Sequence, residues 1–212
     1  FEIESGKILT KTYTFFGSKY EIKSKISFAG FNDLISNNSY DLVWSNGIRS
    51  VERNSVDEAN YSNASVYYGD EQVIVDASSV GEKEVKEFRG RVDWLTVRNK
   101  YFAAIIIPDD SKKVEGAYIE GIQETRGIDG LHETYDVRLT LPFQNQKVET
   151  QSFTLFIGPV DYKELEAYGR NLVKIVDFGS FFGLKFIVRP IAEYILLPLF
   201  QFINLFIPNY GF

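Results

Sequence analysis

The sequence predicts a mainly β fold, a large antiparallel sandwich followed by helices at the C-terminal end. Apolar and polar residues alternate in short runs from Lys7 to about Phe156, which is typical of strands with one buried face. After Pro159 this period changes, and the composition becomes strongly apolar from Phe178 onward. With 212 residues, 44% hydrophobic and 25% charged, the chain is large enough to bury a substantial core.

The strands can be placed from the alternation and from the turn residues between them. The clearest run is 135–143, where five apolar residues alternate with polar ones. The run Tyr101–Ile107 is continuously apolar and ends at Pro108, which predicts a central strand covered on both faces. Further strands are predicted at 8–16, 20–28, 40–44, 65–68, 72–76, 94–97 and 118–122, with turns at 45–47, 69–70, 109–111 and 129–130.

Outside the predicted strands, two polar stretches, 52–63 and 81–91, are predicted to be solvated loops because they hold mixed charges and few apolar residues. Asp161 precedes Glu164 by three residues and Gly169 follows, a pattern that predicts a short capped helix. We therefore expect a sandwich over 1–160, a helical connection packed on it over 161–177, and an amphipathic helix over 178–212.

The C-terminal segment is the most unusual part of the sequence. Of its 35 residues, 22 are apolar, and only Lys185, Arg189 and Glu193 are charged. On a helical wheel of about 100° per residue these three fall in one half with Gln201 and Asn204, although Leu197 also lies there. Pro190 is predicted at a first helical position, and Pro198 is predicted to bend the helix. The opposite half gathers Ile191, Ile195, Leu199, Phe202, Ile203 and Phe206.

The length of this segment limits its relation to a membrane. The charge-free run 194–207 would be roughly 21 Å long as a helix, against about 30 Å of hydrocarbon. It is too short to span and is predicted to lie in the headgroup plane, the alternative being an ordinary core helix packed on the sandwich. The residues expected at the interface are Lys185 and Arg189 toward lipid phosphates, with Phe186, Ile195, Leu199, Phe202, Ile203 and Phe206.

Composition excludes several classes of chemistry. A net charge of −6 argues against a nucleic-acid partner, which would require a concentrated excess of Lys and Arg. Zero Cys removes thiol catalysis and disulfides, and the single His132, expected at the surface, cannot supply a histidine cluster. Gly179 and Gly183 lack the Lys and Ser or Thr of a phosphate loop. We expect no catalytic residue, cofactor or metal, and the lack of Met suggests a piece of a longer protein.

Two stretches carry motifs in a recognisable order: 92–108 holds Trp94, then the pair Tyr101-Phe102 and then Ile107-Pro108, and 153–159 ends in Gly158-Pro159. Together they resemble the large periplasmic domain of bacterial YidC membrane protein insertases, in which these motifs occur in the same order. Val176-Asp177-Phe178-Gly179 looks like the family's Val-Asp-Tyr-Gly, and 190–212 looks like its interfacial helix. Residues 1–91 match only in strand character.

The resemblance implies a β-supersandwich similar to that of galactose mutarotases, with C-terminal helices, on the periplasmic side of the bacterial inner membrane. It implies a non-enzymatic part of the machinery that inserts and folds inner-membrane proteins, alone or with the Sec translocon. The implied partners are nascent inner-membrane proteins, Sec components including SecDF, and lipid headgroups. Trp94, Tyr101, Phe102 and Ile107 are expected in the core, and Gly158-Pro159 at a strand-to-helix turn.

Two other interpretations stay open at this point. A carbohydrate-binding or carbohydrate-active sandwich would bind sugar near His132. A lipoprotein-like binding module would use the Phe-rich tail as a groove for a protein partner instead of a lipid anchor.

Overall fold

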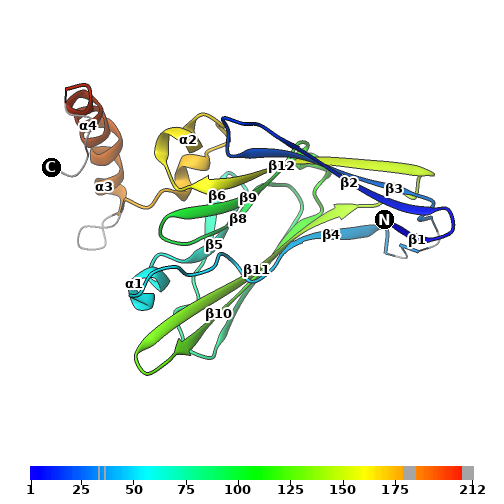
Figure 1. The fold of residues 1–212 in the computed structure, drawn as a ribbon, viewed down its shortest axis with the longest axis horizontal. Coiled ribbons are helices and arrows are strands. Elements are labelled where there is room, and N and C mark those ends of the chain that lie inside the picture. Colours follow the sequence, from blue (N-terminus) through cyan, green and yellow to red (C-terminus); the bar gives the residue numbers. More distant parts are fainter. Residues whose placement is uncertain (33, 36, 179–184, 207–212) are drawn as a thin grey trace. The chain divides into compact units, whose positions relative to one another are not determined.

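The computed structural model describes residues 1–32, 34–35, 37–178 and 185–206. The chain forms two compact units, 1–172 and 173–212 (Figure 1). The first unit holds every β-strand among the described residues, and the second holds the C-terminal helices.

Two antiparallel sheets form the first unit. The larger has eight strands, whose order across the sheet is β1 (Glu2–Glu4), β2 (Lys7–Phe15), β3 (Glu21–Ala29), β12 (Val148–Pro159), β9 (Phe102–Pro108), β8 (Val92–Arg98), β5 (Asn63–Tyr68) and β6 (Glu71–Val75). The smaller has four, in the order β4 (Ser39–Trp44), β11 (Gly130–Pro142), β10 (Gly116–Arg126) and β7 (Lys83–Arg89).

The sheets lie face to face as two layers (Figure 1), and the main core fills the space between them. Leu95 and Ile106 of the larger sheet pack in one cluster with Ile119 and Leu139 of the smaller sheet. The predicted antiparallel sandwich is therefore confirmed. Residues 102–107 of the continuously apolar run lie in β9, between β12 and β8, and Ile105 and Ile106 are both buried. The expected central strand is therefore also confirmed, although Tyr101 precedes it.

Two predictions of solvated loops are wrong. The stretch 81–91 contains β7, an edge strand that pairs only with β10; charged residues are common on such edges, which hides the strand pattern. The stretch 52–63 contains α1 (Ser55–Ala59), capped by Asn54, whose side chain accepts a hydrogen bond from the Asp57 amide. The polar composition concealed this helix because the buried residue that fixes it, Glu58, is itself charged.

The helix predicted after Pro159 is confirmed as α2 (Tyr162–Glu166). Asp161 Oδ1 accepts hydrogen bonds from the amides of Lys163 and Glu164, and Gly169 follows with φ +63°. Two 3₁₀ turns complete the connections, η1 (Ser111–Lys113) and η2 (Leu172–Ile175).

Residues 185–204 of the second unit form a helical stretch in three parts. These are α3 (Lys185–Ile191), a π-helical turn η3 (Ala192–Leu196) and α4 (Leu197–Asn204). Pro190 lies inside α3 and not at its first position as predicted, whereas Pro198 is the second residue of α4. Among the described residues, no helix has the length and apolarity that a membrane crossing requires.

Candidate functional site

A second buried layer lies on the face of the larger sheet that is turned away from the smaller one. Paired residues of neighbouring strands share a face, so Tyr67, Trp94, Ile105 and Phe156 point opposite to the inner core residue Leu95. Trp94, Ile105 and Phe156 are nevertheless buried. The segment 160–172 covers this face, with Leu165 and Leu172 buried and the Tyr168 ring edge-on to Phe156 at 5.4 Å between centroids.

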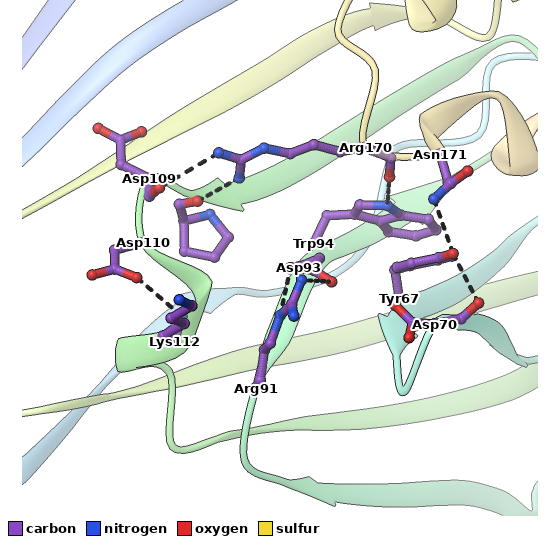
Figure 2. A network of polar contacts seen from close by, with 11 residues as sticks. Tyr67, Asp70, Arg91, Asp93, Trp94, Asp109, Asp110, Lys112, Arg170 and Asn171 are labelled. Carbon is purple, nitrogen blue, oxygen red and sulfur yellow. Dashed lines mark hydrogen bonds and ion pairs between the residues drawn. The ribbon is translucent and has the colours of Figure 1, made fainter.

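Four side chains fasten the end of this covering segment to the sheet (Figure 2), and we call Tyr67, Trp94, Arg170 and Asn171 the exit clamp. Trp94 Nε1 donates a hydrogen bond to the Arg170 carbonyl oxygen at 2.9 Å. The Arg170 guanidinium donates to the Pro108 carbonyl oxygen at 2.7 Å. Asn171 Nδ2 donates to Tyr67 Oη at 2.9 Å, and the Tyr67 ring stacks on Trp94 at 5.4 Å.

The clamp holds the backbone of Arg170 and Asn171 in a conformation that is unfavourable in the absence of these contacts. Arg170 and Asn171 have φ of +50° and +60°, the left-handed region that side chains other than glycine rarely adopt. Such positions cost on the order of 1 kcal/mol or more each and persist where surrounding contacts determine them. The hydrogen bonds and the Trp94 stack therefore fix the path by which the chain leaves the sandwich.

Arg170→Ala removes both side-chain bonds from the clamp to the end of β9, at the carbonyls of Pro108 and Asp109. We expect the unfolding free energy to fall by about 1–2 kcal/mol, measured by urea denaturation, because one partly buried carbonyl loses its charged donor. Arg91→Ala, which removes only an exposed pair with Asp93, is the control and should leave the midpoint unchanged. Equal midpoints for the two variants would contradict a holding role for Arg170.

In the second unit, Arg189 joins the helix to the segment that precedes it. Its Nε lies 2.7 Å from Glu193 Oε1, its Nη2 donates to the Val173 carbonyl oxygen at 2.9 Å, and its guanidinium lies 5.6 Å from the centre of the Phe178 ring. This side chain is thus half-buried and occupied by contacts within its own unit. Its predicted contact with lipid phosphate stays a prediction.

The rest of the helix exposes a continuous apolar surface. Phe202 and Phe206 are 60% and 72% exposed, with their rings 5.3 Å apart, and neither ring is covered. Of the predicted interface residues, Ile195, Leu199 and Ile203 are exposed as well, while the side chains of Lys185 and Phe186 lie outside the described part of the structure. The structure adds members that the sequence did not single out, namely Tyr194, Leu196, Phe200 and Leu205.

A family model for the YidC periplasmic domain matches residues 1–194. The chain belongs to this family. Its relatives include a membrane protein insertase YidC of Chloroherpeton thalassium, which is 36% identical; the match covers the whole chain and 36% of the relative's length. Another, from Prosthecochloris aestuarii, is 37% identical; that match covers 99% of the chain and 35% of the relative's length. A third, from Chlorobium limicola, is 35% identical over 99% of the chain and 34% of its own length.

The chain therefore spans about a third of the length of the curated relatives that it matches. The predicted resemblance to YidC is confirmed, and so is the location of the domain on the periplasmic side of the inner membrane. The relatives' name describes an insertase and no enzyme, which agrees with the expectation of a non-catalytic domain.

The family-motif residues of the YidC periplasmic domain occupy different environments. Trp94 and Ile107 are buried as expected, but Tyr101 and Phe102 are 42% and 48% exposed, so their prediction as core residues is wrong. Tyr101 lies in the turn before β9, where its hydroxyl donates to Glu52. Apolar composition places these two residues in the strand. They lie at or just before its beginning, however, where no neighbouring layer covers their side chains.

Gly158 and Pro159 are the last residues of β12, and the turn toward α2 follows them directly. A Cβ on Gly158 would lie 2.6 Å from Cγ of the Tyr20 ring, so the position has no room for a larger residue. Pro108 ends β9 and supplies the carbonyl that Arg170 binds. Asp177 is exposed, and Gly179 lies outside the described residues.

Sequence reasoning missed Arg170 and Asn171 in the clamp, and it missed Glu58. Asn tolerates the left-handed region, so the run Gly169-Arg170-Asn171 carried a weak signal of an unusual turn. The Glu58 carboxylate is buried and accepts hydrogen bonds from the amides of Val51 and Glu52 and from Asn99 Nδ2. Nothing in its local sequence indicates burial, because two of the donors are backbone amides and the third, Asn99, lies 41 residues away in the chain.

His132 is half-buried, and its Nδ1 lies 3.3 Å from Ser50 Oγ. It borders a cavity of about 290 Å³ that is also lined by Arg49, Glu124 and Arg126. No group of three or more His, Cys, Asp or Glu suited to a metal occurs in the part of the chain that the structure describes.

Proposed function

We propose that this YidC periplasmic domain is a non-enzymatic positioning part of a membrane protein insertase, which inserts and helps fold nascent inner-membrane proteins. The observation that carries the proposal is the uncovered apolar face of the C-terminal helix, in a chain whose relatives are named membrane protein insertases. The sandwich would supply a rigid body, and the segment 161–177 would connect that body to the helix.

The helix has the chemistry of an interfacial anchor. Residues 194–206 carry no charge, and their exposed side chains are aromatic and aliphatic, which suits the boundary between headgroups and acyl chains. Each fully buried Phe or Leu would contribute roughly 1.5–3 kcal/mol on leaving water. Lipid headgroups are therefore proposed as direct partners of this helix, with Lys185 and Arg189 at the phosphate level.

The Sec translocon, including SecDF, is proposed as a protein partner on the family resemblance alone. No surface of the sandwich is assigned to it. A carbohydrate-binding role near His132 is not favoured, because the relatives that match are named insertases.

Flotation with vesicles of phosphatidylethanolamine and phosphatidylglycerol tests the anchor. We expect the chain to float, and Phe202→Ser with Phe206→Ser to lower the bound fraction at least tenfold because two exposed aromatic anchors are lost. Tyr13→Ser with Phe15→Ser is the matched control, since it removes two exposed aromatic residues from β2 instead. Equal flotation of both double variants would exclude a specific helix anchor, and no flotation of the unmodified chain would favour a tail that packs on protein.

A further inference from the structure

The helical stretch changes its geometry in the middle. The amide of Leu197 donates to the Ala192 carbonyl oxygen, a bond five residues back where an α-helix spans four. A π turn of this kind is equivalent to one extra residue inserted into an α-helix. Relative to an unbroken α-helix, every residue after the π turn is therefore rotated backwards by about 100° around the helix axis.

Two prolines flank the turn and give it a cause. Pro190 lies two residues before Ala192, and Pro198 lies two residues after Leu196. Proline has no N–H to donate, and in a regular α-helix the Pro198 ring would clash with the carbonyl of Tyr194, four residues earlier. A wider turn over Ala192–Leu196 takes the backbone before Pro198 out of regular α geometry, which would relieve such a clash.

The shift aligns the polar residues of the two helices. In an unbroken α-helix the midpoint of Arg189 and Glu193 and the midpoint of Gln201 and Asn204 would lie about 70° apart around the axis. The one-residue shift of the π turn reduces this offset to about 30°. The four residues then fall within about 80° and form a polar stripe, which the half-buried Leu197 interrupts.

The burial of three of the four stripe residues agrees with this alignment. Arg189, Glu193 and Asn204 are half-buried, whereas Gln201 is exposed. Arg189 donates to the Val173 carbonyl oxygen and stands over Phe178. The side chains on the opposite side are exposed, including Ile195, Leu199, Phe202 and Phe206. The apolar residues before and after the π turn thus form one unpartnered surface.

We propose that the π turn is a register device: it sets the rotation of α4 so that the apolar faces before and after it meet the lipid together. This proposal rests on the lipid interface proposed above. The occupant of the surface is a bilayer, because the surface carries no charge over 194–206 and the relatives of the chain are named membrane protein insertases.

Two changes at one place test the register. Deletion of Leu196 together with Pro198→Ala removes both the extra residue and the ring that clashes with a regular α turn, and it keeps the phase of α4. Vesicle binding should then stay within about twofold of the unmodified chain. Insertion of one alanine between Leu196 and Leu197 rotates α4 by about 100° and should weaken binding at least fivefold. A role for the helix that depends on apolar content alone would make the deletion the more harmful change, because only the deletion removes a leucine.

A position-specific label gives a second measurement. The chain has no Cys, so Gln201→Cys and Phe202→Cys each offer one attachment point for a fluorophore that responds to polarity. With vesicles, we expect the label at 202 to enter lipid and the label at 201 to stay in water, both in the unmodified background and in the deletion. The insertion should move the label at 201 into lipid.

Equal binding and unchanged labels for deletion and insertion would overturn the register role while leaving the lipid anchor intact. Failure of the unmodified chain to bind vesicles would instead reject the anchor itself.

Discussion

Trp94→Ala is expected to lower the free energy of unfolding by about 3–5 kcal/mol, the range for removing a large buried aromatic side chain. The indole is fully buried, stacks on Tyr67 and donates to the Arg170 carbonyl oxygen. Its loss leaves a cavity beneath the segment 160–172 and removes one bond from the exit clamp. Urea denaturation would measure the loss, and amide hydrogen exchange should show faster opening of residues 165–172 than of β11.

Trp94→Phe helps to separate the two contributions, because it keeps most of the aromatic volume but loses the N–H donor. We expect it to cost about 1–2 kcal/mol and to loosen the same amides. Trp44→Ala is the control for tryptophan removal in general, since Trp44 lies on the edge strand β4 and is only partly buried. A loss for Trp94→Ala no larger than for Trp44→Ala would contradict the role of Trp94 as the centre of the second core.

Glu133 should make the stability of the sandwich depend on pH. The side chain is 7% exposed between the sheets, and burial raises its pKa from 4.5 to about 7, although Tyr135 Oη and Gln123 Nε2 both donate to it. The folded state therefore binds this proton more tightly than the unfolded state does between pH 4.5 and 7. The resulting stabilisation is complete below about pH 4.5 and is lost as the pH rises to 7, by about 3 kcal/mol.

Glu133→Gln should flatten this part of the pH profile, because the amide is neutral throughout. Its oxygen can accept from Gln123 Nε2, and its NH2 group can donate to Tyr135 Oη, whose own hydrogen can turn to the Ser62 carbonyl oxygen. Unfolding free energies at half-unit steps from pH 5 to pH 8 would show the change in slope. Glu120→Gln is the matched control on the adjacent strand, where Lys83 and Tyr118 lower the pKa of the carboxyl, so its profile should keep the original slope over this range. An unchanged slope for Glu133→Gln would show that the buried carboxyl does not titrate there.

The sandwich was predictable from the sequence because its strands bury one face. In a half-buried strand, apolar and polar residues alternate along the sequence. β11 and β9 were found in this way. β7 was not, since an edge strand with charged residues on both faces has no such period. The interface residues of the C-terminal helix were selected by the same reasoning, from apolarity and spacing alone.

The exit clamp could not be predicted, because its bonds join residues far apart in the chain. Arg170 binds the carbonyl of Pro108, and Asn171 binds Tyr67, more than a hundred positions away. The π turn was missed for a different reason: a helical wheel assumes one angle per residue throughout, and that assumption fails where prolines widen a turn.

The position of β12 in the larger sheet has a consequence for how the domain forms. β12 lies between β3 and β9, so the N-terminal hairpin of β2 and β3 joins the rest of the sheet only through a strand that begins about 120 residues later. During synthesis from the N-terminus, the edge of β3 that will pair with β12 stays unpaired while the intervening strands are made. Closure over so long a loop is slow, so the last long strand to be synthesised sets the pace of folding.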